Sequence, residues 1–278
     1  MEGNYQAHHF ETGEITKVAI LQGFNLTKWF GGLCAVKNVN FSMEEGEILG
    51  LIGPNGAGKT TLINIVTGNY SPSSGQILYE GRNIEGLKAY QVNNLGISRT
   101  FQIVRIFPKL TVLDNVRSAL VDRKTRLPWK VALDSLVKHK EAQATGRNGE
   151  MVATQLLESV GLASYRHELA ENLPYAYGKR LEIARALATH PRILLLDEPS
   201  SGLNPKEQND QISIIRKINA QGITILIVEH VMKVIMDISH RIMVLHYGEK
   251  IAEGTPAEIY KNEKVVEAYL GGETGADR

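Results

Sequence analysis

The chain alternates between short continuous apolar runs and stretches in which apolar residues recur every three or four positions. The continuous runs predict buried parallel strands at residues 48–52, 193–196 and 223–228. The spacing of amphipathic helices is found at residues 62–66, 179–188 and 205–222. Strands that alternate with helices in this way predict an α/β fold.

Other segments predict antiparallel strands on either side of this region. Residues 18–21 and 36–42 predict two strands joined by a turn around 30–32, and residues 76–79 predict a third before the Glu80-Gly81 turn. We expect these strands to form a small antiparallel layer. Near the end of the chain, residues 241–245 and 250–252 predict a hairpin around Tyr247-Gly248, and short helices follow over 256–270.

Residues 110–169 carry a helical pattern with no strand signal. We interpret them as part of an α-helical subdomain, about 103–190, that is inserted into the α/β core. The first residues are polar and lack periodicity, which predicts a flexible N-terminal tail over 1–15. The remainder, 16–278, is predicted to form a single domain.

Composition narrows the classes of ligand and partner. The 278 residues include 31 basic and 30 acidic side chains, so no overall field attracts nucleic acid or a membrane surface. Cys34 is the only cysteine, which excludes an internal disulfide and a cysteine metal cluster and favours an intracellular protein. The apolar runs are too short to span a bilayer, so we expect any membrane role to depend on partner subunits.

A glycine-rich segment lies between the strand at 48–52 and the helix that starts near residue 59. It matches G-x-x-x-x-G-K-[ST], the P-loop of nucleotide-binding proteins. Glycines allow the backbone to wrap a polyphosphate, with the amides of the loop and helix N-terminus directed at the anion. The lysine reaches the β- and γ-phosphates and the threonine after it offers a hydroxyl to Mg²⁺. The predicted ATP-binding residues are Gly53, Pro54, Asn55, Gly56, Ala57, Gly58, Lys59, Thr60 and Thr61.

Two carboxylates follow the apolar run at 193–196. Because parallel strands deliver their C-terminal residues to one edge of the sheet, Asp197 is placed to hold Mg²⁺ through its water shell. Glu198 is placed to accept a hydrogen bond from an attacking water, as a catalytic base. The strand at 223–228 delivers His230 to the same edge, where it is a candidate to contact the γ-phosphate. Taken alone, a histidine after a strand is more often structural, so this assignment depends on the resemblance given below. These residues together predict a P-loop NTPase.

Two further residues are open to more than one interpretation. Phe30 lies in the predicted turn after the first strand and is a candidate to stack on an adenine ring, with Trp29 as a second candidate. Packing of the ring on the sheet is the alternative. Gln102, taken alone, is an ordinary exposed loop glutamine. By contrast Asn204-Pro205-x-Glu207 is a well-defined helix start, with Asn204 as the N-cap.

The order of these motifs resembles the nucleotide-binding subunits of ABC transporters over residues 18–271. The motifs are the P-loop, R-L-E-I-A-R-A-L at 180–187, L-L-L-D-E-P at 194–199, S-G-L-N-P at 201–205 and V-E-H at 228–230. Within that family, R-T-F-Q at 99–102, L-T-V-L-D-N-V at 110–116 and E-G-T-P-A-E-I at 253–259 are similar to the ATPases of branched-chain amino acid importers.

The resemblance implies a RecA-like core and several residue roles. It makes Phe30 the adenine-stacking residue, Gln102 the glutamine-loop residue that contacts the nucleotide and its Mg²⁺, Glu198 the base and His230 the switch histidine. Metal binding is thereby assigned to Thr60, Gln102 and Asp197. It also implies that residues 201–204 communicate across a head-to-tail dimer, formed with a second copy or a paralogue.

One motif departs from the family pattern. The usual signature L-S-G-G-Q faces the γ-phosphate bound by the other subunit, and a gapless alignment through Arg180 puts Leu173, Pro174, Tyr175, Ala176 and Tyr177 there. A two-residue shift instead matches the A-Y-G at 176–178 to a variant of close relatives. We prefer the gapless register, because the helix after it then aligns without a deletion. The signature hydroxyl is missing in both registers.

The sequence therefore predicts an ATPase subunit that binds MgATP and drives transmembrane permease subunits for branched-chain or related amino acids. An extracytoplasmic solute-binding protein is an indirect partner, and the expected location is the cytoplasmic face of the cell membrane. The alternatives are a soluble ABC ATPase of DNA repair or translation and an importer ATPase for urea or amides. A small-molecule P-loop kinase is disfavoured by D-E-P and V-E-H. The transported solute is not encoded in these motifs.

Overall fold

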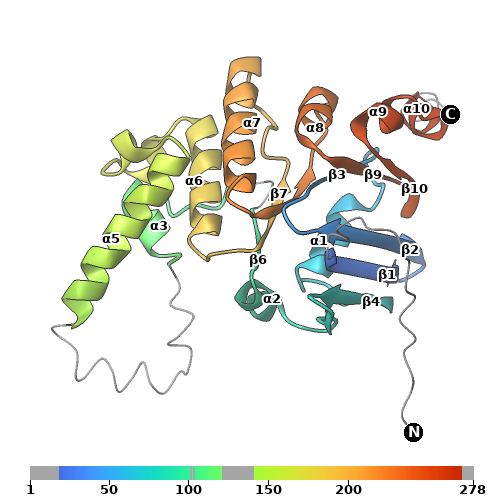
Figure 1. Cartoon of the computed structure of the whole chain (residues 1–278), viewed down its shortest axis with the longest axis horizontal. Helices are drawn as coiled ribbons and strands as arrows, with labels where there is room; N and C mark the ends of the chain where they lie inside the picture. Colours follow the sequence, from blue (N-terminus) through green and yellow to red (C-terminus); the bar gives the residue numbers. More distant parts are fainter. Residues whose placement is uncertain (1–18, 101, 103, 121–140, 271–278) are drawn as a thin grey trace, which may run out of the picture.

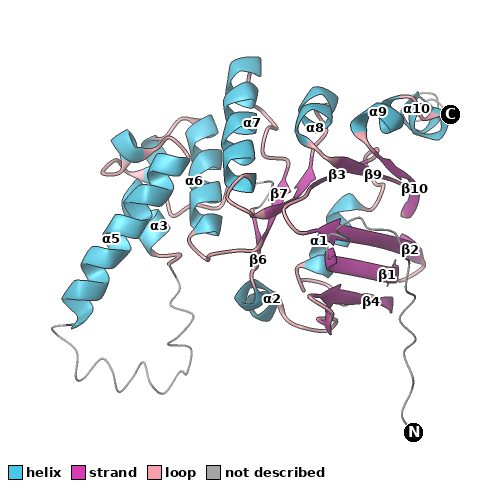
Figure 2. Ribbon diagram, in the orientation of Figure 1, coloured by secondary structure: helices cyan, strands magenta, loops and turns pink. Residues whose placement is uncertain are grey.

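The computed structural model describes residues 19–100, 102, 104–120 and 141–270, which form two β-sheets and the helices around them (Figures 1 and 2). The antiparallel sheet has the order β2-β1-β4-β5. Its strands are β1 (Ala19–Phe30), β2 (Leu33–Glu44), β4 (Ser74–Tyr79) and β5 (Arg82–Asn83). The six-stranded sheet has the order β10-β9-β3-β8-β7-β6. Its strands are β3 (Ile48–Ile52), β6 (Ile97–Arg99), β7 (Ile193–Asp197), β8 (Thr224–Val228), β9 (Arg241–His246) and β10 (Glu249–Gly254).

Five of the six strands in the second sheet are parallel, and β10 pairs antiparallel with β9 at one edge. Every residue of β3, β7 and β8 is buried, as expected of strands covered on both faces. On β8 the side chains alternate between two hydrophobic cores: Ile225 and Ile227 join one, and Leu226 and Val228 join the other.

The six-stranded sheet separates these two cores, and different helices belong to each. The first core contains residues of α6 (Tyr175–Leu187), α7 (Pro205–Asn219) and α8 (Met232–Ile238), and the second contains residues of α1 (Lys59–Val66) and the antiparallel sheet. Figure 1 accordingly shows α7 and α8 on one side of the six-stranded sheet and α1 with β1 and β2 on the other. The remaining elements are α2 (Ala89–Leu95), α3 (Val112–Arg117), α5 (Glu141–Ser159), α9 (Pro256–Tyr260), α10 (Glu263–Leu270) and the 3₁₀ turns η1 (Ala163–Tyr165) and η2 (Ala170–Asn172).

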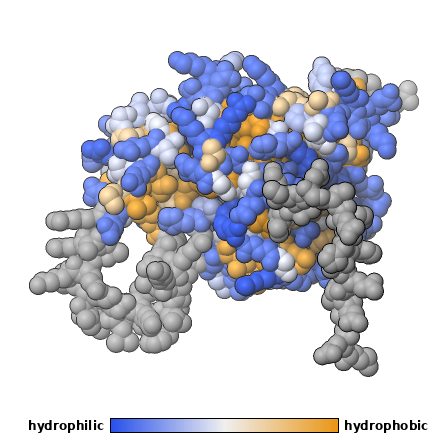
Figure 3. Space-filling view, in the orientation of Figure 1, coloured by the Kyte–Doolittle hydropathy of each residue, from blue (hydrophilic) through white to orange (hydrophobic). Residues whose placement is uncertain are grey.

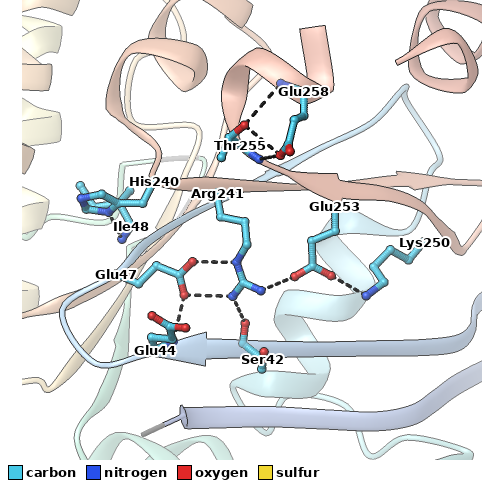
Figure 4. Close-up of polar contacts among 10 residues, drawn as sticks. All are labelled: Ser42, Glu44, Glu47, Ile48, His240, Arg241, Lys250, Glu253, Thr255 and Glu258. Atoms are coloured by element: carbon cyan, nitrogen blue, oxygen red, sulfur yellow. Dashed lines mark hydrogen bonds and ion pairs between the residues drawn. The ribbon is translucent and has the colours of Figure 1, made fainter. Parts of the chain in front are cut away.

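A charged cluster ties the two sheets together where β3 and β9 begin (Figure 4). The guanidinium of Arg241 donates to both carboxylate oxygens of Glu47, at 2.8 and 3.0 Å, to Glu253 at 2.6 Å and to the carbonyl of Ser42 at 2.6 Å. The backbone amide of Glu44 also donates to Glu47 Oε2, at 2.8 Å. The hydrogen bonds to Glu47 raise the pKa of Arg241 above its already high ordinary value. Arg241 therefore keeps its positive charge at every physiological pH.

Most predicted elements are confirmed, with some boundaries wrong. The first two strands are longer than predicted, running to Phe30 and from Leu33, although the turn between them lies at 31–32 as expected. The predicted hairpin, the terminal helices and the Asn204 cap are confirmed. Two short helices, α2 and α8, were not predicted.

The helical segment also differs in part from expectation. Its helix α6 starts at Tyr175, a full turn before the predicted start near residue 179. Glycine at position 178 favours a loop by propensity, but here it lies inside the helix, where a Cβ would be 3.5 Å from Val104. Within the described residues, α3, α5, α6 and the two 3₁₀ turns form the helical part. The predicted N-terminal tail, and residues 121–140 of the insert, lie outside the described residues.

Candidate functional site

The loop between β3 and α1 has the backbone that a phosphate cradle needs. Gly53, Gly56 and Gly58 have φ angles of 150°, 78° and 98°, a region that favours glycine. Two of these positions also lack space for a side chain, since a Cβ would lie 2.1 Å from the Leu245 carbonyl oxygen at Gly53 and 2.4 Å from the Ala35 carbonyl oxygen at Gly58. Gly53 and Gly58 are therefore required by the close packing of this loop against β9 and β2.

Lys59 is buried at the first position of α1 and turns back over this loop. Its Nζ donates to the carbonyl oxygens of Gly53, at 2.6 Å, and Pro54, at 2.9 Å. Burial lowers the pKa of Lys59, and the negative charges of Glu198 and Asp197 oppose that shift. The lysine thus lies within the electrostatic reach of both carboxylates, although they come from a distant part of the sequence.

Asp197 ends β7 and is held by a residue that the sequence analysis did not single out. Its Oδ2 accepts from Arg99 Nη2 at 2.7 Å, and Arg99 Nη1 donates to Asn64 Oδ1 at 2.6 Å. The side chains of this ion pair are only 9% and 5% exposed. Arg99 is brought there by the pairing of β6 with β7, which sequence order does not reveal. The sequence feature that could have identified Arg99 is its position in the R-T-F-Q motif, three residues before Gln102.

Glu198 contacts two other predicted site residues. Gln102 Nε2 donates to Glu198 Oε2 at 2.9 Å, and His230 Nε2 lies 2.6 Å from Glu198 Oε1. This meeting depends on strand register, because Asp197 pairs with Val228 across β7 and β8. The backbone of Glu198 has a φ of 51°, which is uncommon for a residue with a side chain.

A polar cavity of about 450 Å³ lies beside α1 and the carboxyl end of β7. Its lining includes Thr60, Gln102 and Asp197, the three predicted metal-binding residues, together with Arg99 and Tyr70. A hydroxyl, an amide and a carboxylate supply the oxygen donors that Mg²⁺ prefers. Mg²⁺ needs only a few protein ligands when the phosphate oxygens of a nucleotide complete its coordination. The donor set therefore fits a nucleotide-bound Mg²⁺.

Phe30 is not among the residues that line this cavity, although its neighbour Tyr70 is. Phe30 is 42% exposed at the end of β1, and its ring makes an edge contact with Tyr70 at a centroid distance of 5.3 Å. Lys28 Nζ lies 5.2 Å from the same ring. The ring thus has an exposed surface available for stacking, while Trp29 beside it is 49% exposed. Both open interpretations of Phe30 remain compatible with this arrangement.

The predicted signature residues form the start of α6. Pro174 is the N-cap, and Tyr175, Ala176 and Tyr177 make the first turn. None of these residues lines the cavity that contains Thr60, Gln102 and Asp197. Tyr175 instead contacts the segment after Glu198, since a Cβ at Gly202 would be 3.1 Å from its ring. Pro174 and Tyr175 are exposed, as a surface that meets a second subunit would be.

A glycine-lined loop with a buried lysine, set against two carboxylates, a glutamine and a histidine at the carboxyl edge of a parallel sheet, defines a P-loop nucleotide-binding protein. Comparison with known proteins gives the family. The ABC transporter family matches residues 36–201, and the branched-chain amino acid ATP-binding cassette transporter family matches residues 249–274. The chain belongs to the ABC transporter family, as its motifs predict.

Relatives of known function align over nearly their whole length. The chain is 42% identical over 253 residues to BraF, a high-affinity branched-chain amino acid transport ATP-binding protein of Pseudomonas aeruginosa, covering 91% of this chain and 98% of the relative. It is 44% identical over 244 residues to LivG of Escherichia coli K12, a protein of the same description, covering 87% and 94%.

Solved structures agree with the fold prediction. A nucleotide-free ATP-binding cassette from an ABC transporter matches with a TM-score of 0.77 and 30% identity, covering 91% of this chain and 99% of that one. A dimeric cassette bound to ADP and phosphate matches with a TM-score of 0.70 and 27% identity, covering 85% and 98%. These matches confirm the predicted P-loop fold with an antiparallel layer and a helical part.

Proposed function

We propose that this chain is the ATP-hydrolysing subunit of an ABC importer for branched-chain or related amino acids. The observation that carries the proposal is the Glu198 carboxylate, held between Gln102 and His230 and within electrostatic reach of Lys59. The amino acid class rests on the relatives, which are named as branched-chain amino acid transport proteins. The same relatives favour an importer over the alternatives in DNA repair, translation and urea or amide uptake.

Each residue of the cluster has a chemical task in this proposal. Loop amides and Lys59 bind the phosphates and neutralise their charge. Thr60, Gln102 and Asp197 hold Mg²⁺, which supplies electrostatic stabilisation of the phosphoryl oxygens when bound. Glu198 orients the attacking water and accepts its proton. His230, at 2.6 Å from Glu198 Oε1, orients that carboxylate and, in this proposal, contacts the γ-phosphate.

A second ATPase subunit completes the proposed site. Pro174 and Tyr175 are exposed at the start of α6 and do not line the cavity beside α1 of their own chain, which suits contact with nucleotide on a partner. The partner is a second copy of this chain or a paralogue, arranged head to tail. One structural relative is described as a dimer bound to ADP and phosphate.

Permease subunits are the proposed membrane partners. Among the helices of the described residues, none is long and apolar enough to cross a membrane. Among the described residues of the helical part, the exposed large hydrophobic side chains are Phe107, Leu110, Met151, Leu169 and Tyr175. Figure 3 shows apolar residues reaching the surface on the side where this part lies. Docking there would place the ATPase at the cytoplasmic face of the cell membrane, with a solute-binding protein acting across it.

Two substitutions separate binding from hydrolysis. Lys59→Ala should abolish tight ATP binding, because it removes the cation from the phosphate loop. Glu198→Gln should bind ATP normally and form an ATP-dependent dimer on gel filtration, while hydrolysis falls by roughly a hundredfold to ten-thousandfold. Lys217→Met, on an exposed part of α7, is the control and should change neither quantity. Normal hydrolysis by Glu198→Gln would remove Glu198 from the role of base.

A further inference from the structure

Two buried charged residues near Glu198 have no part in the mechanism above. Lys179, on α6, is 3% exposed, and Glu229, directly after β8, is 2% exposed. A buried charge is destabilising unless hydrogen bonds or an opposite charge compensate it. The groups that compensate these two side chains therefore indicate what each one holds in place.

Lys179 reaches from the helical part to the backbone of the proposed base. Its Nζ donates to the carbonyl oxygen of Glu198 at 2.7 Å in a buried hydrogen bond. Tyr175, one turn earlier on α6, has its ring 5.4 Å from the same Nζ. The first turns of α6 thus contact the segment that follows β7 at two points, at Glu198 and at Gly202.

Glu229 holds the same segment from the opposite strand. Its Oε1 accepts from the backbone amide of Ser200 at 2.6 Å, and the amide of Glu198 donates to the carbonyl of Val228 at 2.9 Å. Burial raises the pKa of Glu229, while the Ser200 hydrogen bonds and the charge of Lys179 act to lower it. The two buried charges therefore attract each other across residues 198–200.

These contacts explain how Glu198 keeps an unfavourable backbone conformation. A left-handed φ of 51° is costly for glutamate and persists only where surrounding contacts hold it. The Glu198 carbonyl is fixed by Lys179, its amide by Val228, and the amide two residues later by Glu229. Since this backbone sets the direction of the Cβ, it also sets where the carboxylate lies.

We propose that Lys179 and Glu229 are positioning residues for ATP hydrolysis, which clamp residues 198–200 so that the Glu198 carboxylate faces the attacking water. This inference rests on the proposed function, in which Glu198 is the base. Neither residue touches the P-loop contacts of Lys59, so the clamp acts on the rate of hydrolysis and leaves nucleotide binding unchanged. Displacement of a catalytic group by about 1 Å costs up to a hundredfold in rate.

The test compares kcat with the dissociation constant for ATP in the purified full-length chain. Lys179→Met removes the ammonium and keeps the length of the side chain, and Glu229→Gln keeps an acceptor for Ser200 and removes the charge. We expect Lys179→Met to lower kcat by about ten- to a hundredfold and Glu229→Gln by less, each with an unchanged dissociation constant. Lys217→Met, a lysine on the exposed face of α7, is the matched control.

The double variant Lys179→Met/Glu229→Gln provides a second readout. Residues that act through one backbone segment are not additive, so its kcat should fall no further than that of the worse single variant. A purely structural role would instead lower kcat and the number of ATP-binding sites per chain by the same factor, and that result would overturn the proposal. The proposal would also be overturned if both single variants had the wild-type kcat.

Failure of this inference is distinguishable from failure of the proposed function. If Glu198→Gln hydrolyses ATP normally, the assignment of the base is wrong and the clamp has no catalytic group to position. If Glu198→Gln is inactive but Lys179→Met and Glu229→Gln hydrolyse at the wild-type rate, only the clamp is wrong. Should Lys179→Met not fold, Lys179→Gln, which retains a hydrogen-bond donor, and Glu229→Gln decide the question.

Discussion

The two ends of the parallel sheet carry charged clusters that differ in whether their charges are paired with one another. At the amino end, Arg241 binds the carboxylates of Glu47 and Glu253 and the carbonyl of Ser42, so each charge is opposed within the cluster (Figure 4). At the carboxyl end, Lys59 binds carbonyls of its own loop and lies within electrostatic reach of Asp197, which ends β7, and of Glu198, which follows it. The first cluster is complete in itself, whereas the second has the groups to bind a polyanion and its metal.

This difference indicates that the amino end of the sheet contributes to the stability of the fold, whereas the carboxyl end carries the groups proposed for ATP hydrolysis. Charges at the amino end join the antiparallel sheet to β9 and β10 and contact no predicted site residue in the described part of the chain. Charges at the carboxyl end come from strand ends, where β-strands stop and loops begin, and so can exchange partners without breaking the sheet. Substitutions at the two ends should therefore separate folding from activity.

The largest expected effect is on stability at the amino end. Arg241→Met leaves Glu47, which is 6% exposed, without its cation. Loss of one partner of a buried pair destabilises by roughly 3 kcal/mol, the lower part of the usual range, because Arg241 is itself partly exposed. Urea unfolding measures the change. ATP binding per folded molecule should be unaffected, and a selective loss of binding would show that the two ends are coupled.

A smaller effect on stability is expected at the carboxyl end, and it should depend on ligand. Arg99→Leu leaves Asp197 buried without its partner, which should cost about 2 kcal/mol. Because Mg²⁺ bound beside Asp197 replaces the missing charge, MgATP should restore more thermal stability to the variant than to the wild type. Thermal unfolding with MgATP, and with ATP plus EDTA, tests this. Equal restoration by both would place the metal elsewhere.

The third prediction concerns the surface that a partner subunit completes. Pro174 is the N-cap of α6, where it provides no side-chain hydrogen bond. Pro174→Ser should add a hydroxyl for the γ-phosphate of the partner's nucleotide, worth about tenfold in ATP-dependent dimerisation per site. Light scattering of the Glu198→Gln background across an ATP titration measures it. An unchanged or weaker dimer would favour the two-residue shifted register of the signature.

The smallest expected effect is the pH dependence of stability due to Glu229. Burial raises the pKa of Glu229 above its ordinary value of 4.5, so the folded state holds that proton more tightly than the unfolded state. Its favourable contribution is present below pH 4.5 and is lost as the pH rises through the folded-state pKa. Glu229→Gln should therefore flatten the fall in unfolding free energy above pH 4.5. An unchanged pH profile would mean that Glu229 stays charged throughout.

Sequence alone predicted the parts of this molecule whose signals are local. The P-loop requires glycines at fixed spacing, and the Asn204 cap requires Glu207 three residues later, so both are readable from a few neighbouring residues. The strands β3, β7 and β8 are readable because burial on both faces leaves them apolar throughout. Glu198 and the two residues that meet it, Gln102 and His230, were predicted from resemblance and from the common edge of parallel strands.

What the sequence did not reveal depends on contacts between distant segments. Arg99 meets Asp197 only because β6 pairs with β7, and Lys179 meets Glu198 only because α6 packs against the same strand end. Arginine and lysine are treated as exposed polar positions when a hydrophobic pattern is analysed, so the pattern does not indicate that these two side chains are buried. The short helix α2 has one buried residue, Val92, which is too few to create a helical pattern.

The hydrogen bonds of Lys59 to Gly53 and Pro54 have a consequence for how fast a nucleotide can bind. The loop is already folded around its own lysine, so the conformational entropy of ordering it is lost during folding of the protein and not at the moment of encounter. A nucleotide needs only to exchange two carbonyl partners of one ammonium group for phosphate oxygens. Association should therefore proceed in a single kinetic phase whose rate rises linearly with nucleotide concentration, with no slow loop rearrangement to limit it.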